Sequence, residues 1–171
     1  MLKPAIMYKQ EIEKEFMNHV YSNDFFLYSG YAGSNELPNI ELKDNYYQWA
    51  IIDERTEKVI GYFAYYIDRE NDTVSRFGLF SFDRGNIRIG RDVYEKMIEL
   101  IEFHRRVEWR MIGGNPVQNS YDRLCKKYNG NRVHLHAVTK DENGKWHDEY
   151  IYEIIKDSNS WHNEYIYEYI K

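Results

Sequence analysis

The stretch from Arg76 to His104 carries the residues with the clearest capacity for chemistry. An aromatic run that ends at Phe82 leads into a short segment with two glycines and with three arginines, Arg84, Arg88 and Arg91, and then into helical spacing. Loop amides and the positive end of a helix bind phosphate together, and arginines add charge-assisted bonds to its oxygens. The stretch therefore predicts a strand, an anion-binding loop and a helix. A solvated basic loop in an acidic protein is the alternative.

Length and composition limit the possible classes of protein. The chain has 171 residues and a net charge of −5, with 43% hydrophobic and 17% aromatic residues. This fits one soluble globular domain, and the acidic balance disfavours binding to nucleic acid or to an anionic membrane. The one cysteine, Cys125, has no internal disulfide partner. The longest apolar run, Val59 to Ile67, is too short for a membrane helix. We expect a cytoplasmic protein, with homo-oligomerisation left open.

Periodicity predicts the order of the elements that position the arginine-rich stretch. The expected order is a helix at 7–21, strands at 48–53, 59–68 and 73–82, a helix from a capping box at Asp92 to about 105, a strand at 107–112, a helix at 117–128, and strands at 132–139 and 147–155. The first three strands form an antiparallel meander. A right-handed crossover then makes strand 107–112 the parallel neighbour of strand 73–82.

The C-terminal segment repeats the last expected strand. Residues 146–156 and 161–171 match at nine of eleven positions. We therefore divide the chain into a single domain at 1–156 and an extension at 157–171. The repeat is either a local duplication or an additional edge strand that pairs within the chain or with a partner.

In this order of elements the chain resembles the GCN5-related N-acetyltransferase (GNAT) superfamily, and in particular its ribosomal-protein and small-substrate branch. The resemblance extends from about Met7 to Ile155. It is most specific in RGNIRIGRDV at 84–93, in RRVEWRMIGGNP at 105–116 and in KWHDEYIYEI at 145–154. It implies an α+β fold of three layers, in which helices flank a mixed, mostly antiparallel sheet with a splayed central pair of parallel strands.

The resemblance also implies acetyl-coenzyme A (acetyl-CoA) as co-substrate and assigns residues to it. The segment expected to hold the pyrophosphate contains Asn86, Ile87, Arg88, Ile89, Gly90, Arg91 and Asp92. The strand expected beside the pantetheine arm contributes Leu79, Phe80, Ser81 and Phe82, and the following elements contribute Asn115 and Ser120. The family loop carries two small residues, and neither register of this segment supplies both: with Asn86 as the anchor, Ile89 and Arg91 stand at the two positions, and with Gly90 as one small residue, Arg88 stands at the other.

The catalytic acid expected from the resemblance is a tyrosine in the helix after Asn115. Cys125 stands at that position here, with Tyr121 and Tyr128 on the adjacent helical turns. All three are candidates to protonate the departing thiolate, and Tyr121 is preferred because a phenol suits this task. Cys125 also fits a small buried hydrophobe. The base is left open among Glu108, His134 and His136.

No metal site is expected, because His134 and His136 lack the clustered ligand spacing of a zinc site. The predicted function is acetyl-CoA-dependent transfer of acetyl directly to the primary amine of a small molecule or peptide. Two alternatives remain. One is a catalytically weak or inactive GNAT-fold protein that binds a ligand or a partner, and the other is an assembly protein that uses the repeated C-terminal strand.

Overall fold

The computed structural model describes residues 1–20, 22, 37–141 and 143–156. Within these residues the strands form a seven-stranded mixed sheet in the order β1-β2-β3-β4-β5-β7-β6. The elements are β1 (Leu2–Pro4), η1 (Ala5–Tyr8), α1 (Lys9–His19), β2 (Tyr46–Ile52), β3 (Val59–Asp68), β4 (Thr73–Ser81), α3 (Ile87–Phe103), β5 (Arg106–Ile112), α4 (Gln118–Lys127), β6 (Asn131–Lys140) and β7 (Trp146–Ile155).

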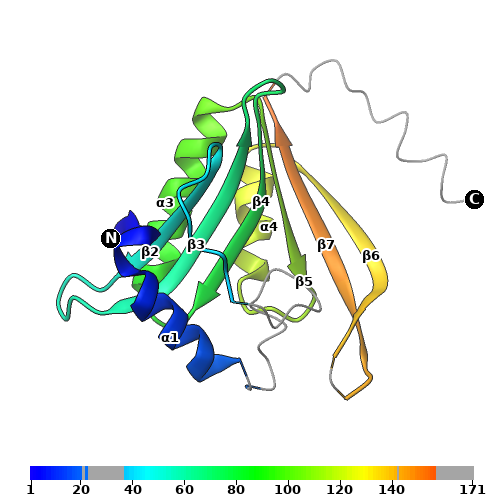
Figure 1. Cartoon of the computed structure of the whole chain (residues 1–171). Helices are drawn as coiled ribbons and strands as arrows, with labels where there is room; N and C mark the ends of the chain where they lie inside the picture. Colours follow the sequence, from blue (N-terminus) through cyan, green and yellow to red (C-terminus); the bar gives the residue numbers. More distant parts are fainter. Residues whose placement is uncertain (21, 23–36, 142, 157–171) are drawn as a thin grey trace, which may run out of the picture.

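Helices cover both faces of the sheet and make three layers (Figure 1). On one face, α1 buries Ile12 and Phe16 against the aromatic side chains of β3 and β4. On the other face, α3 and α4 pack on a larger cluster that includes Met97 and Leu124. The strands alternate between the two clusters, because successive side chains point to opposite faces of a sheet. The expected α+β architecture with flanking helices is confirmed.

The parallel pair β4–β5 is joined only at its start. Thr73 pairs with Arg106, and Val74 pairs with Val107. Beyond these residues β4 continues beside β3, and β5 continues beside β7. The two strands therefore diverge toward their C-terminal ends, as Figure 1 shows. This confirms the splayed central pair.

A bulge interrupts β4 just after it parts from β5. Tyr66 pairs with Ser75 and Ala64 pairs with Gly78, so that two residues of β4, Arg76 and Phe77, face a single residue of β3. Arg76 has a φ of 54°, which is uncommon for a residue with a side chain. A bulge leaves its additional residue outside the regular ladder. The irregularity therefore lies at the place where the sheet opens.

The start of α3 differs from the sequence prediction. Helix α3 begins at Ile87, and the side chain of Asn86 caps it by accepting a hydrogen bond from the Arg88 amide at 3.0 Å. The capping box expected at Asp92 is therefore wrong, because Asn86 already satisfies the helix terminus and Asp92 lies inside the helix with a buried side chain. Residues 87–92, expected in a loop, form the first turns of α3.

The other expected elements agree with the structure to within a few residues at their ends. Helix α4 ends as predicted before Asn129, whose φ is 51°. The three-residue strand β1 was not predicted, since so short a segment shows no periodicity. The extension at 157–171 lies outside the described residues.

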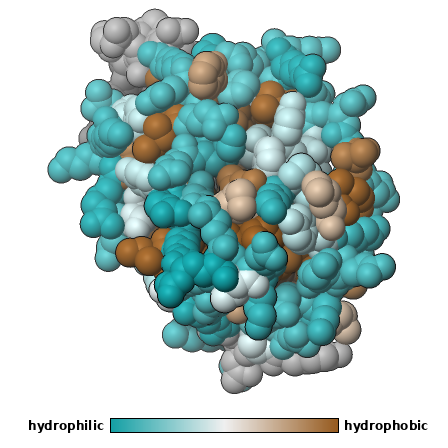
Figure 2. Space-filling model, turned by 90° about the vertical axis from the view of Figure 1, so that its left-hand side faces the viewer, coloured by the Kyte–Doolittle hydropathy of each residue, from teal (hydrophilic) through white to brown (hydrophobic). Residues whose placement is uncertain are grey.

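Hydrophilic residues cover most of the side shown in Figure 2, and they separate the hydrophobic ones into small groups. In the part of the chain that the structure describes, no helix has the length and apolar character needed to cross a membrane.

Candidate active site

A cleft of about 1210 Å³ opens where β4 and β5 part. Apolar and aromatic side chains from β3, β4 and β5 line it, and they include Phe63, Phe77, Leu79, Trp109 and Met111. Polar and charged residues of the same strands and of the neighbouring segments also contribute to the lining. A cavity of this size and character is typical of a binding site for an extended ligand.

The segment that leads into α3 forms one end of the cleft. Arg84, Gly85, Asn86, Ile89 and Gly90 line this end. Gly85 has a φ of 79°, a conformation that glycine adopts without strain. A Cβ atom placed on Gly90 would meet no atom within 4 Å, apart from the helix's own neighbouring backbone. A ligand can therefore approach the backbone of the first turn of α3 closely, at the end of the helix that attracts anions.

Arg88 and Arg91 do not line this cleft. Arg88 Nη1 pairs with Asp53 Oδ1, and Arg91 Nη2 lies 3.0 Å from Asp92 Oδ1. Both arginines border a separate depression of about 120 Å³ beside Met1. Asp92 and Ile87 do not line the main cleft either. Asp92 also pairs with the Met1 amine, and Ile87 is 85% exposed. Of the expected pyrophosphate segment, only Asn86, Ile89 and Gly90 face it.

The expected residues of β4 divide between the two faces of the sheet. Leu79 and Ser81 line the cleft. Phe80 and Phe82 point to the α1 side, where their ring centroids lie 4.4 and 5.2 Å from that of Phe16. This division follows from the alternation of side chains along a strand.

Asn115 lines the cleft and also stabilises the turn that precedes α4. Its Oδ1 accepts a hydrogen bond from the Val117 amide at 3.1 Å, and its backbone carbonyl accepts one from the Gln118 amide. Ser120 does not line the cleft; its hydroxyl accepts a hydrogen bond from Arg123 Nη2 at 3.4 Å.

Of the three candidate acids, only Tyr121 lines the cleft. Its ring lies 5.7 Å from that of Trp109 in an edge-on arrangement, and burial raises the pKa of its phenol to about 12. Cys125 is buried, its Sγ lies 3.4 Å from the Asn131 carbonyl oxygen, and burial raises the pKa of its thiol. The Tyr128 hydroxyl lies 3.5 Å from Glu102. The structure therefore separates Tyr121 from the other two candidates.

Several cleft residues were not assigned to the site from the sequence. Arg76 reaches the lining through the bulge in β4, for which the sequence carries no clear signal. Arg84, which the sequence offered with Arg88 and Arg91 as a possible phosphate-binding arginine, lines the cleft. Glu149 on β7 lines the cleft and pairs with Arg110 Nη1 at 3.3 Å. Glu108, considered as a base, lines the cleft and lies 2.8 Å from Arg106 Nη2.

Comparison with known proteins finds similarity in structure alone, since neither a family model nor a curated protein matches the sequence. An N-acetyltransferase from Staphylococcus aureus superposes with a TM-score of 0.64 at 13% identity, over 91% of this chain and 98% of that chain. A GCN5-related N-acetyltransferase from Kribbella flavida gives a TM-score of 0.65 at 14% identity, over 91% and 96%.

A third similar structure contains the cofactor. A GNAT-superfamily phosphinothricin acetyltransferase from Sinorhizobium meliloti, solved in complex with acetyl-CoA, gives a TM-score of 0.64 at 15% identity. The match covers 94% of this chain and 90% of that chain. The expected ribosomal-protein branch stays a prediction. The chain has the fold of the GCN5-related N-acetyltransferases.

Proposed function

We propose that this protein transfers acetyl from acetyl-CoA directly to a primary amine. The observation that carries the proposal is the cleft at the splay of β4 and β5, which ends at an accessible glycine in the first turn of α3. Coenzyme A combines an anionic pyrophosphate with an extended amide-containing arm. The cleft offers a complementary place for each part.

The pyrophosphate would lie at the N-terminus of α3. Arg84 and the backbone of Gly85 and Gly90 border that end of the cleft. A phosphate gains there from the positive end of the helix dipole, and an arginine adds a charge-assisted bond. Of the three arginines that the sequence suggested for this role, only Arg84 lines the cleft, and we therefore assign the role to Arg84.

The pantetheine arm would follow β4. Beyond Val74 the edge of β4 that faces β5 has no ladder partner among the described strands. An extended ligand can pair with such an edge through its amides, as an added strand does. Asn115 also lines the cleft. The thioester would then lie between the two strands, close to Tyr121.

The chemistry then needs three groups around the thioester. A backbone amide of β4 polarises its carbonyl, and the neutral amine attacks the carbonyl carbon. As the tetrahedral intermediate collapses, the C–S bond breaks and the thiolate takes the phenolic proton of Tyr121. The amine loses a proton to Glu108 or Glu149, directly or through water. With its pKa raised to about 12, Tyr121 retains its proton at neutral pH.

The acceptor class follows from the charge of the whole chain. The chain carries a net charge of −5, whereas the cleft itself is lined by both acidic and basic side chains, namely Glu108, Glu149, Arg76, Arg84 and Arg110. A negative overall field favours the approach of a cationic molecule. We therefore propose a small-molecule amine or the amino group of a basic peptide as acceptor.

A two-stage experiment tests the proposal. Thermal-shift titration with acetyl-CoA should raise the melting temperature, because a ligand that binds only the folded state stabilises it. A thiol-release assay over a panel of amines should then show turnover. The absence of any shift at millimolar acetyl-CoA would refute both binding and transfer.

A second candidate is a protein of this fold that binds acetyl-CoA without transferring acetyl. It is favoured by the position of Cys125, which stands where the family tyrosine is expected and is buried away from the cleft. A thermal shift without thiol release from any amine in the panel would support this candidate over the enzyme.

A further inference from the structure

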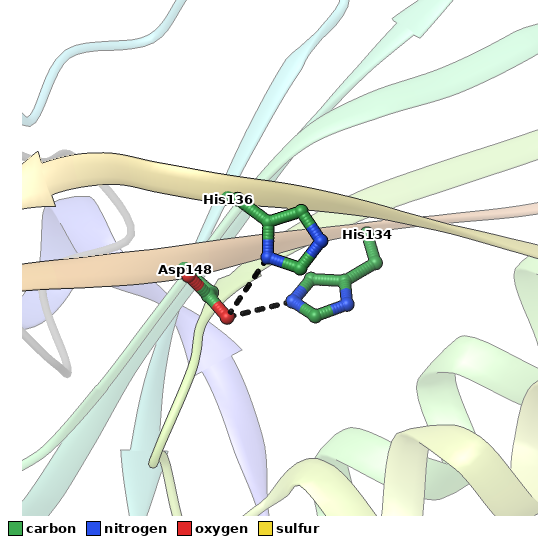
Figure 3. Close-up of side chains that lie close together, drawn as sticks. All are labelled: His134, His136 and Asp148. Atoms are coloured by element: carbon green, nitrogen blue, oxygen red, sulfur yellow. Dashed lines mark hydrogen bonds and ion pairs between the residues drawn. The ribbon is translucent and has the colours of Figure 1, made fainter. Parts of the chain in front are cut away.

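Three side chains with metal-binding atoms meet on the β6–β7 hairpin, outside the cleft. His134 and His136 come from β6, and Asp148 comes from β7 (Figure 3). One ligand atom from each residue lies within 4.8 Å of the other two. We propose that His134, His136 and Asp148 form a binding site for one divalent transition-metal ion, with Zn²⁺ as the ion that fits it best.

The hairpin brings these residues together through strand alternation and a local irregularity. His134 and His136 are two residues apart on β6 and therefore share a face. The register of β6 against β7 shifts between Leu135 and Thr139, and Ala137 has a φ of 51° within that shift. The shift lets His136 approach the same Asp148 carboxylate that His134 contacts.

The interatomic distances are close to those of a metal centre. The neighbouring ligand atoms of a tetrahedral zinc ion lie roughly 3.4 Å apart, given metal–ligand bonds of about 2.0–2.2 Å. His136 Nδ1 lies 3.6 Å from Asp148 Oδ2. His134 Nε2 lies 2.7 Å from the same oxygen, a contact that a small ring rotation would open to the required spacing.

Neighbouring groups hold the ligands in position. The second carboxylate oxygen, Asp148 Oδ1, accepts a hydrogen bond from the Ala137 amide at 3.0 Å. The His134 ring stacks on Tyr150 with 4.6 Å between ring centroids. Such outer contacts orient the ligands of metal sites and strengthen metal binding. The Asp148 carboxylate therefore keeps Oδ2 directed at both imidazoles without an ion.

The chemistry of the ligands indicates the class of ion. Two imidazoles and one carboxylate suit zinc and the neighbouring transition metals, whereas magnesium and calcium prefer oxygen ligands alone. The His136 side chain is 77% exposed and that of Asp148 is 39% exposed. An ion can therefore enter from solvent, and water completes its coordination.

The same chain contains a matched control. His147 Nε2 lies 2.8 Å from Asp141 Oδ2 near the end of the same hairpin, so this pair reproduces the His134–Asp148 contact. It forms no part of the three-residue group. Comparing Zn²⁺ binding after substitutions in the three-residue group and in the His147–Asp141 pair therefore separates metal binding from ordinary histidine–carboxylate pairing.

The experiment is calorimetric titration of the full chain, without a histidine tag, with Zn²⁺. We expect one ion per chain, and at least about tenfold weaker binding in each of His134→Ala, His136→Ala and Asp148→Asn, because each loses a ligand. His147→Gln should bind like the wild type. Circular dichroism of every variant checks the fold.

Asp148→Asn is the sharpest variant, because its amide oxygen still accepts the Ala137 hydrogen bond while the ligand charge is lost. In Cu²⁺-loaded protein, electron paramagnetic resonance should show coupling to two imidazole nitrogens, and this coupling should change in His136→Ala. The proposal is overturned if the wild type binds no Zn²⁺ at 100-micromolar concentrations, if all three ligand variants bind like it, or if His147→Gln loses binding equally.

Discussion

Replacing Gly90 by alanine should stabilise the protein and weaken acetyl-CoA binding. Gly90 lies within α3, its φ is negative, and a Cβ there would meet no atom within 4 Å. Alanine in place of glycine inside a helix stabilises it by about 0.5–1 kcal/mol. For a chain of this length that corresponds to a rise in melting temperature of roughly 1–4 °C.

The same methyl group would lie where the pyrophosphate approaches the helix. A methyl group on Gly90 would occupy the space through which the phosphate approaches the helix backbone, and it would move the phosphate away from Arg84. The loss of one charge-assisted hydrogen bond costs about 1.5–3 kcal/mol, which is roughly a 10- to 100-fold increase in Kd. Calorimetric titration with acetyl-CoA measures the affinity, and thermal unfolding without ligand measures the stability.

Glu95→Ala provides the matched control. Glu95 is exposed on the same helix and does not line the cleft. Its replacement should leave the affinity for acetyl-CoA unchanged. If Gly90→Ala is more stable and binds acetyl-CoA as tightly as the wild type, the phosphate does not approach α3 at this place, and the assignment of the cleft fails.

Other substitutions test the remaining parts of the site. Arg84→Ala should weaken acetyl-CoA binding about tenfold in calorimetry. The double replacement of Arg88 and Arg91 by alanine should change the affinity less than about threefold, because those side chains pair outside the cleft. A larger loss of affinity in the double variant than in Arg84→Ala would contradict this geometry. Tyr121→Phe should lower kcat by about 10²-fold or more, with little change in KM for acetyl-CoA, and unchanged kcat would exclude Tyr121 as the acid. The wild-type rate should show no loss from deprotonation of Tyr121 below about pH 10, because its pKa is raised to about 12 and the protonated phenol is the active form. A fall in the wild-type rate near neutral pH that is absent in Tyr121→Phe would contradict this prediction. Cys125→Ala should keep thiol-release activity within about twofold, since Cys125 lies outside the cleft, and a loss comparable to that of Tyr121→Phe would give it a catalytic role.

The architecture could be predicted from the sequence because its signals are local and repeated. Runs rich in β-forming residues between turns marked β3 and β4, helical spacing marked α3, and the Asn129-Gly130 stop signal marked the end of α4. The crossover rule then placed β5 beside β4 in parallel. The short strand β1 was missed, because three residues show no periodicity.

The directions of the side chains were much less predictable. Arg88 and Arg91 were suited to phosphate by charge alone, but helix α3 begins five residues before the expected cap and turns them toward Asp53 and Asp92. Asn86 was the available signal, since asparagine is among the preferred N-cap residues. Choosing it over Asp92 required knowledge of which helical face is buried.

The metal-ligand group shows a second kind of limit. His134 and His136 were visible as a pair on one strand face, but their third partner depends on the register of β6 against β7. That register shifts by way of Ala137, a residue that does not ordinarily favour a positive φ. The contact with Asp148 could therefore not be inferred from spacing.

The most direct test of the proposed function is calorimetric titration of the wild-type chain with acetyl-CoA. The structure predicts saturable binding of one molecule per chain, because a single cleft lies where β4 and β5 part, and the anion-binding end of α3 borders it. We expect dissociation constants in the micromolar range. No binding at millimolar acetyl-CoA, by a chain whose fold is verified by circular dichroism, would contradict the proposal that this cleft holds the cofactor.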